Sequence, residues 1–311
     1  MTSMPNHGDL RAELETLTTE AFRPELSEID RLSTLEIAHL MNGEDTTVPA
    51  AVAAQLPFIA AAIDDIAERM ARGGRLVYAG AGTAGRLGVL DASECPPTFN
   101  TDPSRVIGVI AGGPTAMVAS IEGAEDSREL AAADLDALAL TADDTVVGIS
   151  ASGRTPYAVG AVEHARKQGA LTIGLSCNAH SALASAADHG IEVVVGPELL
   201  TGSTRLKSGT AQKLVLNMLS TITMIRLGKT YGNLMVDVRA SNEKLRARSR
   251  RIVALATGAS DEEIERALAA TDGEVKNAVL TILGGVDGPT AARLLEESGG
   301  HLRAALAASA G

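Results

Sequence analysis

Aromatic side chains are almost absent from this chain: they make up 2% of its 311 residues, and no tryptophan occurs. A surface that binds nucleic acid by stacking bases on aromatic rings is therefore not expected. The formal net charge of −12 points the same way, because an acidic protein repels nucleic acid and anionic membranes. Hydrophobic residues still amount to 45%, so we expect a large aliphatic core, which suits helices packed on a parallel sheet.

Cysteines, long apolar runs and metal-binding motifs are also scarce or missing. The two cysteines, Cys95 and Cys177, form no disulfide framework, which favours a reducing compartment. No apolar stretch approaches the length of a membrane span, and the polar N-terminus carries no signal core. The six histidines show no metal-ligand spacing. The sequence thus predicts a cytoplasmic protein without a metal site or a membrane segment.

Short runs of β-forming residues alternate with helical segments in the middle of the chain. The predicted strands are Arg75–Gly80, Val106–Ala111, Asp144–Ser150, Leu171–Cys177 and Ile191–Gly196. The helices predicted between them are Ala84–Ser93, Thr115–Ala139, Pro156–Gln168 and Ser181–His189. Such alternation predicts an α/β fold, a five-stranded parallel sheet with helices on both faces in three layers. Ligands of these sheets bind beyond the carboxyl ends of the strands.

The flanking segments are predicted to be helical. Helices are expected over Thr34–Asn42, Pro49–Arg72 and Leu206–Gly228. A weak repeat follows in the Ala-rich C-terminal part, where residues 270–278 align with residues 297–305. Two copies indicate a compact appendage, since a solenoid needs at least three. We therefore expect N-terminal helices over residues 1–48, a sheet domain over residues 49–256 and a small helical domain over residues 257–311.

A glycine-rich loop, Gly80-Ala81-Gly82-Thr83-Ala84-Gly85, follows the first predicted strand. It has the spacing of a dinucleotide fingerprint, but no carboxylate ends the second strand to hold a ribose. We interpret the loop as a helix N-terminus, with Thr83, that accepts a sugar or its phosphate. The alternative is a tight strand-to-helix turn that needs glycine for packing alone.

The third predicted strand leads into a loop with three hydroxyl side chains, Ser150, Ser152 and Thr155, just before a helix that starts at Pro156. Hydroxyls and free backbone N–H groups at a helix N-terminus form a phosphate cradle, and the helix dipole favours the anion. The alternative is simple N-capping, which needs one hydroxyl. Three hydroxyls at this spacing favour the cradle.

Three glutamates in the predicted sheet domain are candidates for acid–base chemistry or substrate binding. Glu94 precedes the rigid Pro96-Pro97 at a predicted helix end, and Glu125 lies in an acidic cluster after the second strand. Glu198 follows the fifth strand, where it either acts on a sugar or caps the long helix. A solvated surface carboxylate is the ordinary interpretation of any single glutamate, so composition and spacing do not select Glu94 and Glu125.

Several motifs together resemble the family of N-acetylmuramic acid 6-phosphate etherases. The matching segments are Gly80–Gly88, Asp91–Phe99, Glu122–Asp126, Gly148–Tyr157, Gly196–Lys213 and Gly232–Val238, with Leu32–Ile37 and Glu44–Pro49 also similar. The resemblance covers nearly the whole chain from Thr19 onward. The stretch Phe22–Asp30 departs from the family pattern, which has an Arg-Asn-Pro segment there.

The resemblance implies a sugar-isomerase fold, a homodimer and a C-terminal helical domain like ubiquitin-associated domains. It implies a carbon–oxygen lyase that cleaves the D-lactyl ether of N-acetylmuramic acid 6-phosphate during recycling of peptidoglycan amino sugars. In this family pattern Glu94 is the proton donor to the departing lactate oxygen, and Glu125 is the second essential carboxylate, the expected base at C2. Ser150, Ser152 and Thr155 match the phosphate loop, while Thr83 and Glu198 are further candidates for substrate binding. No metal or redox cofactor is implied.

Two other functions fit the same fold. An aldose–ketose isomerase would share removal of the C2 proton, but it would not carry both Glu94 and Glu125 in these contexts. A non-catalytic sugar-phosphate sensor, like the glucokinase regulator, would be free to lose either glutamate, and both are present.

Overall fold

The computed structural model describes residues 16–238 and 243–310. The chain forms two compact units. The first consists of Met1–Ala92 and Val106–Leu219, and the second of Ser93–Arg105 and Ser220–Gly311. Helices α5 (Gly82–Phe99) and α9 (Lys207–Arg226) each contribute to both. The domain boundaries predicted from the sequence stay a prediction.

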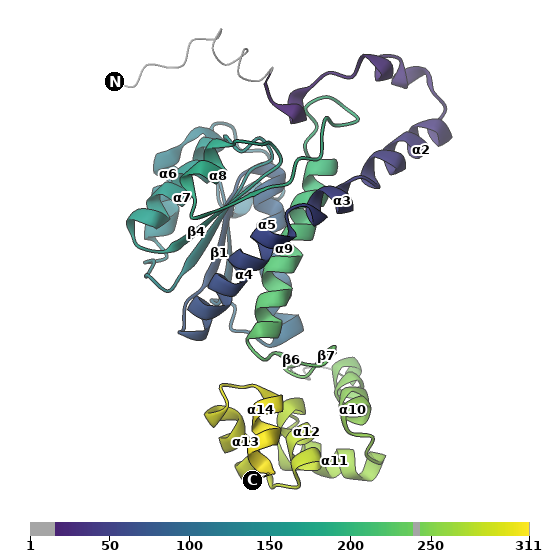
Figure 1. Cartoon of the computed structure of the whole chain (residues 1–311), viewed down its shortest axis with the longest axis vertical. Helices are drawn as coiled ribbons and strands as arrows, with labels where there is room; N and C mark the ends of the chain where they lie inside the picture. The colour runs from purple at the N-terminus through teal and green to yellow at the C-terminus, as the bar shows by residue number, and fades with distance from the viewer. Residues whose placement is uncertain (1–15, 239–242, 311) are drawn as a thin grey trace. The chain divides into compact units, whose positions relative to one another are not determined.

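A five-stranded parallel sheet forms the centre of the first unit (Figure 1). Its strands are β1 (Leu76–Gly80), β2 (Val106–Ile110), β3 (Thr145–Ile149), β4 (Leu171–Ser176) and β5 (His189–Glu192). They lie in the order β2-β1-β3-β4-β5, and every neighbouring pair is parallel. The central strands β1, β3 and β4 are buried along their whole length, as expected for a sheet covered on both faces.

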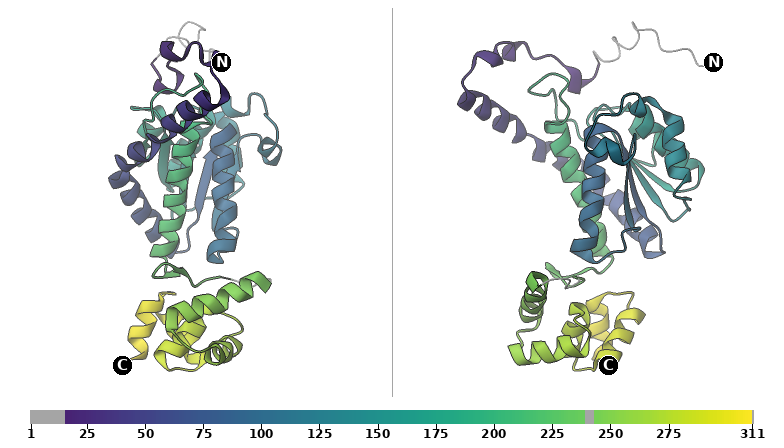
Figure 2. Two further views of the ribbon diagram at one scale, coloured as in Figure 1. Left: turned by 90° about the vertical axis from the view of Figure 1, so that its right-hand side faces the viewer. Right: turned by 180° about the vertical axis from the view of Figure 1, so that it is seen from behind.

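Helices cover both faces of this sheet (Figures 1 and 2). One face carries α6 (Arg128–Asp136), α7 (Pro156–Lys167) and α8 (Ala182–Ala186), and the other carries α4 (Leu56–Ala71), α5 and α9. On the first face Val77 and Val146 of the strands share a core with Tyr157 and Ala161 of α7. The predicted three-layer sandwich with a five-stranded parallel sheet is confirmed.

The segment between β2 and β3 differs from the single helix predicted over Thr115–Ala139. It contains two short 3-10 helices, η4 (Pro114–Met117) and η5 (Ala124–Asp126), followed by α6. Gly123 breaks the helical path because its φ of 73° lies in the left-handed region, which glycine adopts without cost. Ser127 then starts α6, and its side chain accepts a 3.0 Å hydrogen bond from the backbone N–H of Leu130. The break leaves Glu125 in a short, exposed turn.

Helix α5 is longer than predicted, because Pro96 and Pro97 do not end it. A proline within a helix removes one backbone hydrogen bond, yet the last turn continues to Phe99. Asn100 ends the helix in the left-handed conformation, with a φ of 50°. The fifth strand also begins earlier than predicted, at His189, whose Nε2 lies 2.7 Å from Oδ2 of Asp65.

The N-terminal segment runs through short helical elements before the sheet. These are η1 (Thr18–Glu20), η2 (Pro24–Leu26), η3 (Ile29–Arg31), α2 (Thr34–Asp45) and α3 (Val48–Ala53). Ser33 and Glu36 form a capping box at the start of α2, which fixes where this helix begins. In the described part of the chain, no single helix is long and apolar enough to cross a membrane. Only the helical segment Thr34–Ala53, which contains α2 and α3, together with helix Leu56–Ala71 reaches that length and composition, and the two are bent by 60° relative to each other.

The second unit is mainly helical. It contains a two-stranded ribbon, β6 (Thr230–Tyr231) with β7 (Leu234–Met235), and five helices of its own in the described residues: α10 (Glu243–Thr257), α11 (Asp261–Ala270), α12 (Val275–Gly284), α13 (Gly288–Glu297) and α14 (Leu302–Ser309). The two copies of the repeat are the starts of α12 and α14. Val275 and Ala278 in one copy, and Leu302 and Ala305 in the other, enter the same core at 1% exposure or less.

Asp144 joins the starts of β1 and β3 in the first unit. Its side chain is 2% exposed, and it accepts hydrogen bonds from the backbone and guanidinium of Arg75 and from the backbone of Thr141, at 2.7 to 3.0 Å. Burial opposes ionisation of this carboxyl, but the hydrogen bonds from Arg75 and Thr141 outweigh it, so its pKa lies below the ordinary value. Asp144 therefore stabilises the fold in its ionised form.

Replacing Asp144 by Asn tests this anchor. The variant Asp144→Asn leaves the Arg75 charge without its partner, so we expect a loss of about 3 kcal/mol in the free energy of unfolding at pH 7. Because the folded pKa is lowered, the contribution is complete above about pH 4 and disappears as the pH falls through the folded pKa. Urea unfolding of the wild-type protein and of Asp144→Asn at several pH values measures the difference in their free energies of unfolding.

The neighbouring Asp143→Asn provides the matched control. Asp143 pairs with Arg72 at 2.7 Å, but both side chains are more than 40% exposed. Its loss should cost much less than the loss of Asp144, because solvent screens an exposed ion pair. Equal effects of the two substitutions would contradict the assignment of Asp144 as the anchor.

Candidate active site

A pocket of about 670 Å³ opens at the carboxyl ends of β1 and β3. Strand β2 lies on one side of β1 and β3 on the other, so the strand order reverses here. Parallel α/β sheets bind their ligands at such a point. Most of the residues predicted to form the site line this pocket: Thr83, Glu125, Ser150, Ser152 and Thr155. The other lining residues include Leu17, Glu20, Asp126, Thr204 and Gln212.

The loop after β3 holds its three hydroxyl groups within hydrogen-bond distance. Ser150 is 2% exposed, and its Oγ lies 2.7 Å from Oγ1 of Thr155 and 3.1 Å from Oγ of Ser152. The same oxygen accepts a 3.0 Å hydrogen bond from the backbone N–H of Gly153. The loop is therefore braced by its own side chains, and its hydroxyls lie together in the wall of the pocket.

Helix α7 begins directly after this loop. Thr155 occupies the N-cap position, but its side chain makes no capping hydrogen bond, so simple N-capping does not describe it. The N–H groups in the first turn of a helix have no partner within the helix, and the positive end of the dipole favours an anion. Gly153 allows the loop to approach α8, because a Cβ at this position would lie 2.4 Å from Cβ of Ser181.

The glycine loop after β1 serves packing and also lines the pocket. A Cβ on Gly85 would lie 2.6 Å from the carbonyl oxygen of Gly80, so the close approach of α5 to β1 requires glycine. Thr83, in the first turn of α5, lines the pocket together with Gly82. The packing alternative thus explains Gly80 and Gly85, while Thr83 keeps its place in the candidate site.

Glu125 lies where two pockets meet. It lines the main pocket and also a smaller one of about 300 Å³ formed by the segment between β2 and α6. The guanidinium of Arg86 holds this segment to α5 by donating hydrogen bonds to the carbonyls of Met117, at 3.1 Å, and Ala119, at 3.2 Å. Arg86 is therefore a positioning residue for the turn that carries Glu125.

The N-terminal segment supplies part of the wall, which the sequence analysis did not anticipate. Asn178, just beyond β4, is 3% exposed; its Oδ1 accepts a 2.8 Å hydrogen bond from the Thr18 N–H, and its Nδ2 donates to Oγ1 of Thr19 at 3.0 Å. Nδ2 also donates to the carbonyl of Ala151 in the hydroxyl loop, at 3.0 Å. Asn178 thereby holds Leu17 and Glu20 at the pocket. In the sequence, the only indication of this contact was the position of Asn178, a polar residue directly after the fourth predicted strand.

Glu198 is fully buried and does not line the pocket. Its carboxylate accepts hydrogen bonds from the N–H groups of Lys207 and Ser208, at 2.9 and 3.0 Å, and from the Ser208 hydroxyl, at 2.8 Å. Of the two interpretations left open by the sequence, the structure shows capping of α9. Direct contact of Glu198 with a substrate stays a prediction.

The start of α9 is also joined to the N-terminal helices. The ammonium of Lys207 and the guanidinium of Arg23 both pair with the carboxylate of Glu44 in α2. Burial opposes ionisation of Glu44, but these two cations outweigh it and hold its pKa below the ordinary value. This network positions the part of α9 that carries Gln212.

Glu94 is not among the residues that line the pocket. It belongs to the second unit, in the C-terminal half of α5, and its side chain is exposed. About three helical turns of α5 separate it from Thr83. The described residues of one chain therefore do not show Glu94 and Glu125 in a shared site, and their pairing stays a prediction.

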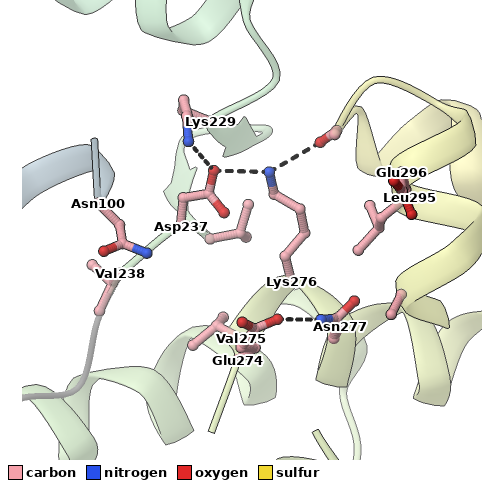
Figure 3. Close-up of a pocket in the computed structure, with 13 residues that line it drawn as sticks. Asn100, Lys229, Asp237, Val238, Glu274, Val275, Lys276, Asn277, Leu295 and Glu296 are labelled. Carbon is pink, nitrogen blue, oxygen red and sulfur yellow. Dashed lines mark hydrogen bonds and ion pairs between the residues drawn. The ribbon is translucent and has the colours of Figure 1, made fainter. Parts of the chain in front are cut away.

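The second unit contains a separate pocket of about 390 Å³ (Figure 3). At its centre the carboxylate of Asp237 pairs with the ammonium groups of Lys229 and Lys276, each at 2.9 Å, and Lys276 also donates a hydrogen bond to the carbonyl of Gly300. Burial lowers the pKa of Lys276, although Asp237 opposes this shift. None of the residues predicted to bind substrate lines this pocket, and both of its ammonium groups are already paired with the carboxylate of Asp237.

The cysteines are buried and not bonded to each other. Burial raises the pKa of the Cys177 thiol to about 12, so it stays protonated at neutral pH. Over residues 16–238 and 243–310, the structure contains no group of three His, Cys, Asp or Glu side chains arranged to hold a metal ion.

Two family models match the part of the chain that contains the sheet. Residues 58–166 match the model of the glucokinase regulatory protein N-terminal SIS domain, and residues 122–222 match the SIS domain. Among solved structures, a phosphoheptose isomerase from Francisella tularensis is 18% identical, with a TM-score of 0.47 over 62% of this chain and 100% of that chain.

Curated relatives match almost the entire chain. The N-acetylmuramic acid 6-phosphate etherase of Streptomyces avermitilis is 87% identical over 99% of both chains. The etherase of Streptomyces coelicolor is 83% identical over the full length of both, and that of Rubrobacter xylanophilus is 60% identical over 94% of this chain and 97% of its own. With a SIS fold and this degree of identity along its whole length, the chain belongs to the N-acetylmuramic acid 6-phosphate etherase family.

Proposed function

We propose that this chain cleaves the D-lactyl ether of N-acetylmuramic acid 6-phosphate, giving N-acetylglucosamine 6-phosphate and D-lactate. The observation that carries the proposal is the pocket at the strand ends, where a hydroxyl-rich helix N-terminus and Glu125 lie together in a member of this family. The first feature suits a phosphate, and the second suits removal of a proton from the sugar.

The chemistry requires a base, an acid and a fixed phosphate. In the opened sugar, C2 lies beside the aldehyde, so its proton is acidic enough to be removed. The electron pair left at C2 forms the C2–C3 double bond as the C3–O bond breaks and lactate departs. Water then adds at C3 of the unsaturated aldehyde. These steps call for no redox or metal cofactor.

We assign the phosphate to Ser150, Ser152 and Thr155, and the base at C2 to Glu125. The hydroxyl network and the α7 N-terminus offer hydrogen-bond donors to the phosphate, and Arg154 of the same loop also lines the pocket. Thr83, in the first turn of α5, lies in the same pocket and is assigned to the sugar. Glu198 acts indirectly in this proposal, by fixing the start of α9.

We assign the proton donor for lactate to Glu94 of a second subunit. Glu94 is exposed, and about three helical turns of α5 separate it from Thr83. In a homodimer, Glu94 of one subunit could donate the proton in the pocket of the other subunit. In a two-fold dimer each subunit would complete the other's site.

We further propose that the protein acts in the cytoplasm, in the recycling of amino sugars. The net charge of −12 supports an enzyme that does not bind nucleic acid or anionic membranes.

An assay of lactate release in deuterated water tests the reaction. With N-acetylmuramic acid 6-phosphate we expect lactate together with deuterium at C2 of the product. Exchange at C2 without lactate would indicate an isomerase, and binding without either would indicate a sensor. Mass spectrometry of the sugar phosphate and an enzymatic lactate assay give both readouts.

Substitution of the two carboxylates tests their roles. Glu94→Gln and Glu125→Gln keep the size of the side chains but remove the acid or base, so lactate release should fall by about 10²- to 10⁴-fold. Glu68→Gln is the control, because Glu68 is an exposed side chain paired with Arg72 on α4. Undiminished turnover in either variant would remove that glutamate from the mechanism.

Mixed dimers test which subunit supplies Glu94. If Glu94 acts across the dimer, a dimer of one Glu94→Gln and one Glu125→Gln subunit contains one intact site and one doubly substituted site. Random pairing of equal amounts should then recover about a quarter of the wild-type rate. Differently tagged subunits allow the mixed dimer to be purified and assayed. Mixed dimers as inactive as either parent would contradict action across the dimer.

A further inference from the structure

Gln212 is a buried amide without a partner in the wall of the active-site pocket. It lies on α9, is 1% exposed, and lines the same pocket as Ser150, Ser152 and Thr155. Within the part of the chain that the structure describes, its Nε2 has no hydrogen-bond partner. Gln212 belongs to the segment Gly196–Lys213, which resembles the family, but the sequence alone gave it no role.

An unpartnered buried amide is costly for the folded protein. Leaving a buried donor unsatisfied costs about 1 to 3 kcal/mol, and folded proteins contain few such groups. An apolar side chain of the same shape would avoid this cost. One turn earlier on α9, by contrast, the buried Ser208 hydroxyl donates to Glu198. The amide at position 212 is therefore better explained by a partner that arrives with a ligand.

We propose that Nε2 of Gln212 donates a hydrogen bond to an oxygen of the sugar chain of the substrate, rather than to its phosphate. This inference rests on the proposed function, since it takes the ligand to be a sugar phosphate. The phosphate already has the hydroxyls and the helix N-terminus of the loop after β3, whereas Gln212 belongs to a different element, α9. A neutral amide donor matches a neutral carbonyl or hydroxyl oxygen.

The position of Gln212 is fixed before any ligand binds. Glu198 caps the start of α9, and Lys207 is paired with Glu44, so the first turns of the helix are held from two sides. Gly209 packs against Thr83, because a Cβ at this position would lie 3.6 Å from Cγ2 of Thr83. An amide carried on such a supported helix can select for a sugar oxygen at low entropic cost.

The substitution Gln212→Met tests the proposal, because methionine keeps an unbranched shape and removes the donor. We measure the Kd of N-acetylglucosamine 6-phosphate and of inorganic phosphate by calorimetry, and the unfolding temperature of the free protein. The Kd of the sugar phosphate should rise about 5- to 10-fold, while that of inorganic phosphate should not change. The unfolding temperature should stay the same or rise, since a buried unsatisfied group is removed.

Two further variants make the result decisive. Gln212→Glu keeps the shape and replaces the donor by acceptors, so it should weaken sugar phosphate binding at least as much as Gln212→Met. Thr223→Val is the matched control, because Thr223 also lies on α9, is fully buried and has no partner for Oγ1 in the described structure. It does not line the pocket, and sugar phosphate binding should be unchanged.

The opposite results would overturn the inference. Unchanged sugar phosphate affinity in both Gln212 variants would remove the contact, and an equal loss for inorganic phosphate would assign Gln212 to the phosphate. A lower unfolding temperature with unchanged affinity would make Gln212 a structural residue, for example one that holds a buried water. These binding measurements do not depend on catalysis, so wild-type protein that binds the sugar phosphate but releases no lactate refutes the proposed function separately.

Discussion

The candidate active-site pocket depends on one buried hydroxyl, that of Ser150 just after β3. Its oxygen accepts the N–H of Gly153 and contacts the hydroxyls of Ser152 and Thr155, so it sets the course of the loop and the direction of its polar groups. Ser150 is almost fully buried and directly follows the central strand β3, so the fold itself fixes the geometry of the loop. A loop organised in this way presents donors to an anion without the reorganisation that a mobile loop would need.

The rest of the pocket is attached to this loop by residues that act through others. Asn178 joins the N-terminal segment to the carbonyl of Ala151, Arg86 fixes the turn of Glu125, and Glu198 fixes the start of α9. Each makes several hydrogen bonds to backbone groups, and both Asn178 and Glu198 are buried. A pocket lined by five distant parts of the chain is thereby held to one geometry. The same arrangement leaves Gln212 with a polar group that the protein itself does not satisfy.

Local patterns predicted the parts of the fold that depend on short-range preferences. The five strands, the two loops at their ends and the starts of α2, α7 and α9 follow from β-rich runs, turn residues and helix caps. The predicted helix over Thr115–Ala139 was wrong, because Gly123 and Ser127 divide a segment whose composition is helical throughout. The end of α5 was also misplaced, since the helix continues through Pro96 and Pro97 and ends only at the left-handed Asn100.

By itself the sequence determined a parallel α/β sheet, a hydroxyl loop at the edge where ligands bind, and the family to which the motifs of Glu94 and Glu125 belong. These features are encoded by residues close together along the chain, so a local pattern reveals them. Only the tertiary structure decided that Glu198 caps α9, that Glu20 and Gln212 line the pocket, and that Glu94 is not among its lining residues. These features depend on contacts between segments that are distant along the chain and on which polar groups are left unpaired by burial. Patterns among neighbouring residues do not predict either.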